Sequence, residues 1–200
     1  MKASICMASG NRPQMLRKTL ESIYSQKVPF EFETVVCDNG EESSEPACSK
    51  FPVTWVRLPP TNGRATVAVS RNAAYRRATG DVIIAQSDEV IHTNPDTIEQ
   101  LVHKLTPGTF LIAYVVNVDV DGHITPWYTT RRRQMPLFFL GSLWRSDLYK
   151  VGGNDEDFVY CSEDSWFADC LMKGLGLRPV YLGGLIGNHQ DHPRPGTSRR

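Results

Sequence analysis

Acidic residues follow a strongly apolar segment near the middle of the chain. Residues 81–85 have the β-branched character typical of a buried parallel strand, and they are followed directly by Gln86, Ser87, Asp88 and Glu89. Ligands of open α/β sheets bind at the carboxyl ends of strands, and Mg²⁺ is usually held by one or two carboxylates together with substrate phosphates. This run therefore fits a metal site about as well as it fits an acidic cap on the following loop.

A second acidic cluster lies late in the chain, at the start of an expected helix. Residues 152–157 supply two glycines and three acids, and Ser162 is followed by Glu163 and Asp164. Acids in a first helical turn often only complement the helix dipole. Two acid clusters on either side of one loop favour a reactive site, because a carboxylate kept ionised at a helix N-terminus can take the proton of an attacking hydroxyl group.

Two polar side chains lie where a nucleotide would bind in an α/β fold. Asp38 follows an apolar strand, so it could accept hydrogen bonds from a base or ribose, or it could form an Asx turn with Gly40. Arg71 carries a planar fork of donors suited to a diphosphate, and a solvated arginine is the plain alternative. The sequence has neither a Walker loop nor a GxGxxG motif, so a metal and arginine would have to neutralise the phosphates.

Histidines and arginines give two weaker signals in the second half of the chain. His189 and His192 lie beside Asp191 after a glycine-rich run, and two imidazoles next to an acid make a modest metal signal without the spacing of a zinc-protease motif. Residues 131–133 are all arginine, and this triplet is either solvated or a docking point for an anionic acceptor.

Apolar runs predict the strands that position these side chains. The runs cover residues 2–7, 32–37, 53–58, 81–85, 110–116 and 178–182. Asp121 and Gly122 predict a tight hairpin turn, and residues 137–150 predict a strand or a helix.

Capping signals and helical spacing predict helices between these strands. One helix begins after an Asn11 N-cap, one covers residues 64–78 and is closed by Gly80, one runs from Asn94 to about residue 105, and one runs from a Ser162 N-cap to about residue 173. The alternation of strands and helices predicts an α/β fold with a mainly parallel central sheet flanked by helices.

Composition narrows the class of protein. The 200 residues are 40% hydrophobic and 22% charged with a formal net charge of zero, which argues against a generally basic nucleic-acid binder. No apolar run approaches the ~18 residues of a membrane span, and the first residues are too short an apolar stretch for a signal peptide. The five cysteines form no CxxC pair, so we expect structural thiols and a cytoplasmic protein.

Short motifs occur in a specific order along nearly the whole chain. They cover residues 4–12 with the helix around 20–24, then 35–40, 70–74, 78–81, 86–89, 152–156 and 162–164. Together they resemble the family 2 glycosyltransferases, whose nucleotide-sugar-binding fold is called GT-A. The resemblance implies a single GT-A domain over residues 1–200. A Rossmann-like nucleotide-sugar-binding half would cover about 1–106, a small acceptor and catalytic half about 107–192, and a flexible tail 193–200.

The resemblance also implies roles for individual positions. Asp88 and His189 would bind Mn²⁺ or Mg²⁺ against the donor diphosphate, with His192 as a weaker substitute for His189. Asp164, next to Glu163, would be the general base that deprotonates an acceptor hydroxyl for direct attack on the anomeric carbon with inversion. The donor-binding residues would be Ala8, Asn11, Arg12, Asp38, Arg71, Gln86 and Ser87.

One position departs from the family pattern. Gln86 stands where the first aspartate of the Asp-x-Asp metal motif is usual, and a neutral amide supplies no charge. Expected metal binding therefore shifts onto Asp88, Glu89 and His189.

Two alternatives to a glycosyltransferase follow from the same residues. A non-catalytic module that binds a sugar nucleotide or glycan is favoured by Gln86, and Trp127 and Tyr128 could stack on a sugar or cover the core. A sugar-phosphate nucleotidyltransferase would keep the fold, but residues 8–12 contain one glycine and no lysine. The expected donor is a nucleotide sugar, UDP-sugar first, and the acceptor remains open among a glycan, a lipid, a protein and a modified nucleic-acid base.

Overall fold

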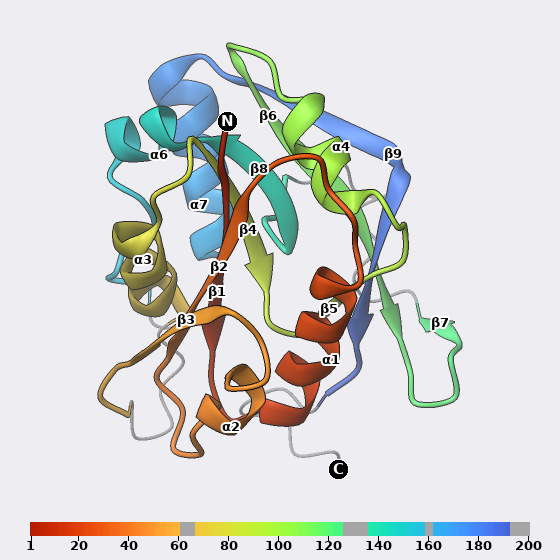
Figure 1. Ribbon diagram of the computed structural model, residues 1–200. Helices are drawn as coiled ribbons and strands as arrows, with labels where there is room; N and C mark the ends of the chain where they lie inside the picture. The colour runs from red at the N-terminus through yellow and green to blue at the C-terminus, as the bar shows by residue number, and fades with distance from the viewer. Residues whose placement is uncertain (61–66, 126–135, 159–161, 193–200) are drawn as a thin grey trace.

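The computed structural model describes residues 1–60, 67–125, 136–158 and 162–192 of the chain. The described strands form one sheet in the order β3-β2-β1-β4-β8-β6-β9-β5, and β7 pairs with β6 beside that path. Helices cover both faces of the sheet, as Figure 1 shows. The α/β architecture predicted from the sequence is therefore confirmed.

The first half of the sheet is parallel. The strands β1 (Ala3–Ser9), β2 (Phe32–Asp38), β3 (Val53–Arg57) and β4 (Val82–Ser87) pair in the same direction. The nearly continuous apolar sequences of β1 and β4 suit strands that are covered on both faces. Because these strands share one direction, their carboxyl ends meet at one edge, at the lower side of the molecule in Figure 1.

The second half of the sheet mixes both directions. The strand β8 (Leu140–Trp144) runs antiparallel to β4 and to β6 (Thr109–Val118), whereas β9 (Arg178–Gln190) runs parallel to β6. The short strand β5 (Val90–His92) pairs antiparallel with β9, and β7 (Ile124–Thr125) forms with β6 the hairpin that the Asp-Gly pair predicts. The β5–β9 pairing brings residues from the middle of the chain beside residues near its end.

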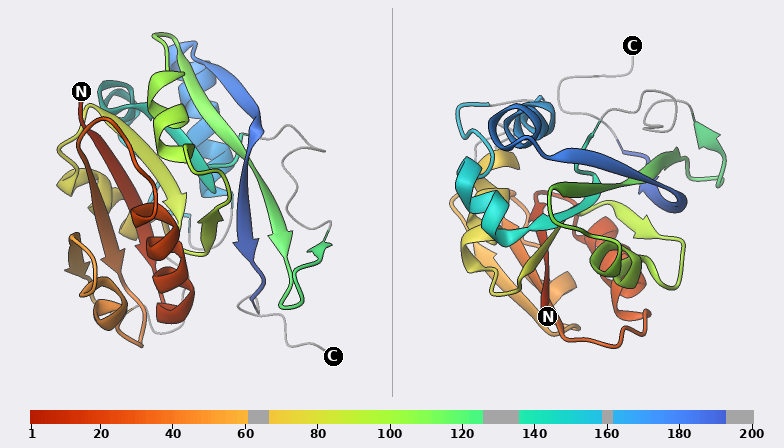
Figure 2. Two further views of the ribbon diagram at one scale, coloured as in Figure 1. Left: turned by 45° about the vertical axis from the view of Figure 1, so that its right-hand side comes forward. Right: turned by 90° about the horizontal axis from the view of Figure 1, so that it is seen from above.

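The helices form two layers. One face of the sheet is covered by α1 (Pro13–Tyr24), α2 (Glu45–Cys48) and α4 (Thr97–His103). The other is covered by α3 (Val67–Arg77), α6 (Arg145–Val151) and α7 (Glu163–Asp169), which continues as a π-helical turn over Cys170–Gly174. Figure 2 shows the sheet between these layers. None of the helices in the described ranges combines the length and apolar character that a bilayer crossing requires.

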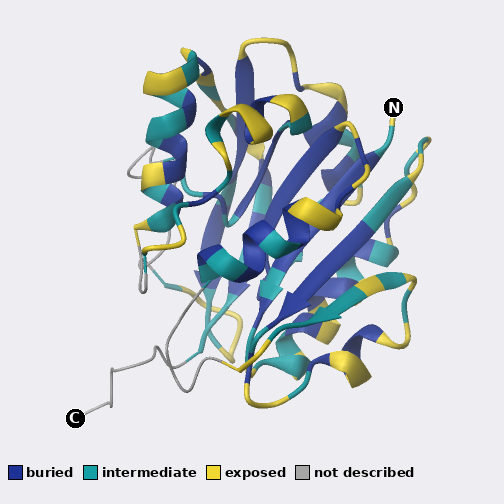
Figure 3. Ribbon diagram, turned by 90° about the vertical axis from the view of Figure 1, so that its left-hand side faces the viewer, coloured by how far each residue is buried: buried dark blue, intermediate teal, exposed yellow. Residues whose placement is uncertain are grey.

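Alternating strand side chains fill one apolar cluster on each face of the sheet. In β1, Ile5 and Met7 pack on the side of α1, and Cys6 packs on the side of α3. The helices pack against these strand residues with stripes of apolar side chains, such as Leu16 and Leu20 of α1. Figure 3 shows the central strands as the most continuously buried part of the molecule. This rigid core holds the polar ends of the strands in place.

Several element boundaries differ from the sequence prediction. The N-cap of α1 is Arg12 and not Asn11, which has a φ of 57° and accepts a hydrogen bond from the backbone N–H of Glu42 at 2.8 Å. The strand β9 continues past Leu182 to Gln190, because an irregularity in its pairing with β6 accommodates a glycine-rich stretch that carries no strand signal. The elements α2 and β5 were not predicted, since each is too short to show a period.

Two predicted helices are shorter in the structure. The helix expected from Asn94 to about residue 105 is α4, whose N-cap is Asp96 and which ends at His103. The helix expected over residues 64–78 is α3, and residues 64–66 lie outside the described part of the chain. The helix expected from Ser162 to about residue 173 is α7 with its π-helical continuation; Ser162 is at the N-cap position, but with a φ of 72° its side chain makes no capping hydrogen bond to the helix.

Gly80 has a different role from the predicted helix stop. Its φ is not in the left-handed region, so it does not close α3 as a left-handed cap. A Cβ at this position would instead fall 2.7 Å from the backbone carbonyl carbon of Ala3 and 2.8 Å from the carbonyl oxygen of Lys2. Gly80 is therefore required because the chain between α3 and β4 passes directly against the start of β1.

Replacing Gly80 with alanine should lower the free energy of unfolding by about 1–3 kcal/mol, because the backbone of β1 must move to make room. Urea denaturation of the purified variant measures this loss. Gly174→Ala is the matched control, since a Cβ at Gly174 meets nothing within 4 Å and its φ is not positive. An equal loss in both variants would contradict the role of close packing at Gly80.

Candidate active site

An acid–histidine cluster lies where β4 ends and β5 pairs with β9. The Glu89 carboxylate reaches His189 with 3.0 Å between Oε1 and Nε2, and His192 with 3.8 Å between Oε1 and Nε2. One ligand atom from each of these three residues lies within 4.8 Å of the others. Asp88, which is 1% exposed, precedes Glu89 at the same turn.

The hydrogen bonds of His189 orient its ring toward the acids. Its Nδ1 lies 2.9 Å from Oδ1 of Asn117, and since an amide oxygen only accepts, Nδ1 is the donor. Its Nε2 lies 3.0 Å from Oε1 of Glu89, so the ring points this nitrogen into the acid pair. The second nitrogen of a metal-bound histidine is commonly fixed by a partner of this kind.

The acid pair itself has capacity for a cation. Oδ2 of Asp88 and Oε2 of Glu89 are buried and accept no hydrogen bond from the described residues. Burial and the neighbouring Glu89 carboxylate raise the pKa of Asp88, although the charge of Arg12 acts in the opposite direction. Burial also acts to raise the pKa of Glu89, but Arg12 and the neighbouring side chains hold this pKa well below its usual range. Carboxylate oxygen and imidazole nitrogen are donors that suit Mn²⁺, so the residues fit a divalent cation.

Arg12 lies against this cluster from the N-terminus of α1. Its Nη2 donates to Oδ1 of Asp88 at 2.9 Å and lies 3.4 Å from Oε2 of Glu89. Its Nη1 lies 2.9 Å from Nε2 of His192. The guanidinium group therefore supplies the positive charge that this cluster faces in the described structure.

The side chain of Gln86 lies inside the fold, on the opposite side of β4 from Ser87. Its Nε2 donates to the carbonyl oxygen of Val90 at 2.8 Å, and its Oε1 accepts from Nε2 of His92 at 2.9 Å. Nδ1 of His92 in turn accepts from Gln26, whose Oε1 accepts from the backbone N–H of Ile98 at 3.0 Å. Both ends of the Gln86 amide are thus engaged by the protein itself.

His92 is neutral in this chain of hydrogen bonds, because burial lowers its pKa from 6.5 to about 3. Between these two pH values the unfolded chain binds a proton that the folded protein excludes, so the free energy of unfolding should decrease as the pH falls below about 6.5. Comparing unfolding at pH 7 and pH 5 measures this slope. His92→Gln should flatten the slope, whereas His103→Gln, which changes a half-exposed histidine, should keep it. An unchanged slope in the His92 variant would rule out its contribution.

Arg71 connects the second acidic cluster to the end of β4. The guanidinium group is buried and forms an ion pair with Asp164 at the start of α7. Its Nη2 donates to Oγ of Ser87 at 3.3 Å and to the carbonyl oxygen of Phe138 at 3.4 Å. Burial acts to lower the pKa of Arg71, but the Asp164 charge outweighs it and the pKa is raised. The Arg71 side chain therefore bridges Asp164 and Ser87, the residue before Asp88.

Hydrogen bonds from Asn72 of α3 hold the acidic loop that precedes α7. Asn72 donates to the carbonyl oxygen of Asn154 at 2.8 Å and to Oε1 of Glu156 at 2.9 Å, which ties the acidic loop to α3. Burial, together with the Asp164 charge, raises the pKa of Glu163. The loop before α7 is thus anchored at two points.

The predicted donor-binding residues are spread along the carboxyl edge of the sheet. Asp38 is buried, and its two oxygens accept hydrogen bonds from the backbone N–H groups of Gly40 at 3.0 Å and Ser44 at 2.7 Å, which realises the Asx-turn alternative. Arg57 pairs with the same carboxylate at 2.9 Å. Ala8 is half-buried near the end of β1, and Asn11 is exposed. Residues 126–135, which include Trp127, Tyr128 and the arginine triplet, lie outside the described residues.

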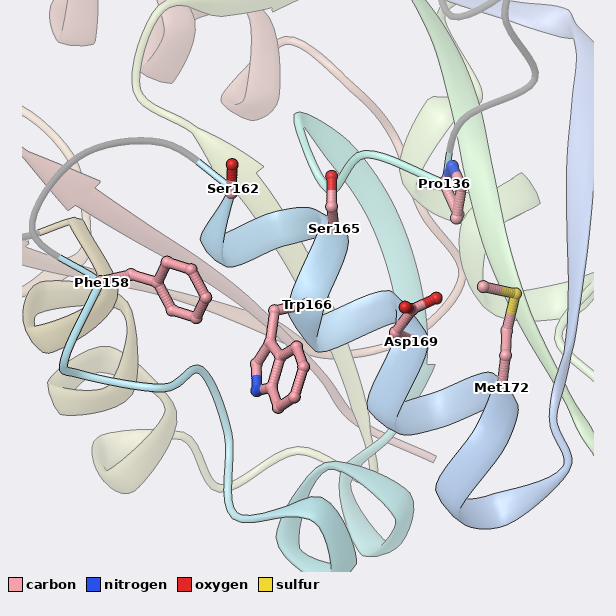
Figure 4. A pocket seen from close by; sticks show the side chains of 7 residues that line it. All are labelled: Pro136, Phe158, Ser162, Ser165, Trp166, Asp169 and Met172. Carbon is pink, nitrogen blue, oxygen red and sulfur yellow. The ribbon is translucent and has the colours of Figure 1, made fainter.

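A pocket of about 330 Å³ lies on the outer side of α7. Its lining residues are Pro136, Phe158, Ser162, Ser165, Trp166, Asp169 and Met172. Figure 4 shows Trp166 and Phe158 side by side at its rim, and their ring centroids are 6.2 Å apart. Asp164 is not among these lining residues, and its side chain is instead buried against Arg71.

Sequence reasoning underweighted two members of the cluster. Glu89 was expected only to share the charge with Asp88, and His192 only to substitute for His189. The two histidines beside Asp191 gave only a modest metal signal. The pairing of β5 with β9, which brings them beside Glu89, could not be read from a three-residue strand.

Comparisons with known proteins add independent findings. The family model described as glycosyl transferase family 2 matches residues 4–164. A curated relative, the uncharacterized glycosyltransferase YfnE of Bacillus subtilis (strain 168), is 32% identical over 96 residues, which make up 46% of this chain and 24% of that protein. The chain therefore spans about a quarter of the length of this relative.

Solved structures share the fold at low sequence identity. S. aureus TarS in complex with UDP-GlcNAc has a TM-score of 0.74 at 17% identity, covering 97% of this chain and 60% of that chain. The mannosyltransferase PcManGT from Pyrobaculum calidifontis, in complex with GDP-Man and Mn²⁺, has a TM-score of 0.71 at 17% identity, covering 99% of this chain and 57% of that chain. GalNAc-T7 with UDP, GalNAc and Mn²⁺ has a TM-score of 0.75 at 13% identity, covering 98% of this chain and 45% of that chain. These likenesses establish the GT-A fold.

Proposed function

The chain belongs to glycosyl transferase family 2, and from this premise we propose that it moves a sugar from a nucleoside-diphosphate sugar to an acceptor hydroxyl group with inversion at the anomeric carbon. The observation that carries the proposal is the Arg71 bridge. Arg71 pairs with Asp164 and also donates to Ser87, the residue before Asp88, which supports placing the proposed base and the acid–histidine cluster in one site.

Asp164 is the proposed general base. An inverting transfer needs a carboxylate that takes the proton of the acceptor hydroxyl as its oxygen attacks the anomeric carbon from the side opposite to the leaving group. The buried ion pair with Arg71 fixes the position of the Asp164 carboxylate at the start of α7. Glu163 is the adjacent carboxylate, but it does not take part in the buried ion pair that fixes Asp164.

Asp88, Glu89, His189 and His192 are the proposed holders of a divalent cation, Mn²⁺ or Mg²⁺. When bound, such a cation would stabilise the negative charge that develops on the leaving nucleoside diphosphate. The unsatisfied oxygens of Asp88 and Glu89 support this assignment, and so do the Mn²⁺ complexes of PcManGT and GalNAc-T7, which have the same fold.

The donor is proposed to be a nucleotide sugar that lies along the carboxyl edge of β1, β2 and β4. Ala8, Asn11, Arg12, Asp38, Arg71, Gln86 and Ser87 remain the candidates for its binding. For Asp38 and Gln86 the contacts would be made through backbone or after rearrangement, because their polar atoms already have protein partners. The complexes of TarS with UDP-GlcNAc and of GalNAc-T7 with UDP favour a UDP-sugar as the donor. The complex of PcManGT with GDP-Man makes a GDP-sugar the second candidate.

A thermal-shift panel of UDP- and GDP-sugars with and without Mn²⁺ tests the proposal. A ligand that binds only the folded protein adds about 2.7 kcal/mol at a hundredfold excess over its Kd, so we expect a clear rise in Tm with the correct donor and Mn²⁺ together. Release of the free nucleoside diphosphate from that donor should follow. No stabilisation by any of the nucleotide sugars would contradict sugar transfer.

The same experiment distinguishes a glycosyltransferase from a non-catalytic binding module, the alternative that the neutral Gln86 favours. Such a module would be stabilised by a nucleotide sugar but would never release the nucleoside diphosphate. Inclusion of acceptor candidates, a glycan, a lipid, a protein and a modified nucleic-acid base, extends the test to the second substrate.

A further inference from the structure

Arg12 occupies the position that a cation would need. Its guanidinium group contacts Asp88, Glu89 and His192 at once, with the closest approaches at 2.9 Å to Oδ1 of Asp88 and Nε2 of His192. The two acids are almost completely buried, whereas the arginine side chain is 27% exposed. A partly exposed cation thus covers a buried acid pair.

The contact between Arg12 and His192 means that Arg12 and a metal ion would compete for the same nitrogen atom. A guanidinium group has only donors, so Nε2 of His192 must offer its lone pair to Nη1 of Arg12. A metal ion would bind His192 through the same lone pair. Arg12 and a metal ion therefore cannot both bind Nε2 of His192, and the like charges would repel each other across Asp88 and Glu89.

The acid pair remains incompletely satisfied even with Arg12 in place. One guanidinium group faces two carboxyl groups: Oδ2 of Asp88 accepts no hydrogen bond from the described residues, and Oε2 of Glu89 has only the 3.4 Å ion-pair contact with Nη2 of Arg12. A divalent cation would satisfy these oxygens better than a single guanidinium does. Arg12 is attached at the N-cap of α1, next to the end of β1, and a small movement of its side chain would turn its fork of donors toward a diphosphate.

We propose that Arg12 is an exchangeable counter-ion. It neutralises Asp88 and Glu89 before the cation binds, and it is displaced from His192 onto the donor diphosphate when the cation arrives. The inference rests on the proposed cation site and adds a positioning role for Arg12 within it. Binding of the cation and of the nucleoside diphosphate should then be coupled through this side chain as well as through direct contact between the two ligands.

Titration of the purified protein with MnCl₂ in a calorimeter, without nucleotide, tests the exchange. Arg12→Gln removes the competing charge and should bind Mn²⁺ more tightly than the unaltered protein, on the order of tenfold. The same variant should bind UDP more weakly at saturating Mn²⁺. Arg17→Gln is the matched control, because Arg17 is an exposed arginine of the same helix that pairs with Glu21 and does not contact the cluster. Its Mn²⁺ affinity should be unchanged.

Equal or weaker Mn²⁺ binding by the Arg12 variant would overturn the proposal, and so would the absence of Mn²⁺ binding in all three proteins. Circular dichroism and the Mn²⁺-dependent rise in Tm establish that the Arg12 variant is folded; if it folds only with Mn²⁺, the cation replaces the arginine and the proposal is supported. Because the titration uses no sugar donor, its outcome is independent of whether the protein transfers a sugar.

Discussion

Asp164→Asn should reduce the rate of sugar transfer by about 10²–10⁴-fold, because an amide cannot take the proton of the acceptor hydroxyl. Donor binding should fall much less than turnover, since the acid–histidine cluster is carried by other elements. The turnover of a nucleotide sugar with acceptor measures the first effect, and the Kd of the donor with Mn²⁺ measures the second. Unchanged turnover would show that another group is the base.

Two further variants make this result specific. Glu163→Gln changes the neighbouring carboxylate and should have a much smaller effect on turnover if Asp164 is the base. Asp169→Asn removes a carboxylate of the same helix that pairs with Lys173 at the protein surface, and it should leave turnover unchanged. If Asp169→Asn lost as much activity as Asp164→Asn, the loss would reflect damage to α7 and not the removal of a base.

Arg71→Met should lower the free energy of unfolding by about 3–5 kcal/mol, because it leaves the Asp164 carboxylate buried without its partner. The two side chains of this pair are only 4% and 11% exposed, so water cannot replace the guanidinium group. Urea denaturation at pH 7 measures the loss. The double variant Arg71→Met with Asp164→Asn should recover part of it, since the uncompensated charge is then gone.

The same helix offers a control for the loss of an arginine. Arg76 pairs with Glu156 at 3.3 Å, but the two side chains are 61% and 44% exposed. Arg76→Met should therefore change the free energy of unfolding by less than about 1 kcal/mol. A loss in Arg71→Met as small as in Arg76→Met, or a double variant no more stable than Arg71→Met, would contradict the account of a buried ion pair.

The regular elements could be predicted because their sequences carry strong local signals. Each of β1, β2 and β4 contains a short apolar run, such as residues 35–37 of β2 and 82–85 of β4, and the apolar stripe of α1 has a clear helical period. The polar residues at the strand ends follow from these elements, so the common edge that bears Asp38 and Asp88 was also predictable. Parallel strands place their carboxyl ends together whatever the details of packing.

The features that could not be predicted from the sequence depend on contacts between distant parts of the chain. The partners of Gln86 lie on other elements, and nothing in its neighbours predicts that His92 and Val90 would engage both ends of its amide. The use of Arg12 as a counter-ion depends on how α1 leaves β1, which is set by the left-handed conformation of Asn11. Roles inferred from motif positions therefore need the structure to show which side chains are already engaged.

The antiparallel pairing of β5 with β9 can form only late in synthesis of the chain. Glu89 and its partner His189 are 100 positions apart, so at 5–20 residues per second a ribosome would make the second about 5–20 s after the first. Throughout this interval Glu89 lacks the strand that carries its partner His189. A cation site that uses both residues would therefore form only after β9 has paired with β5.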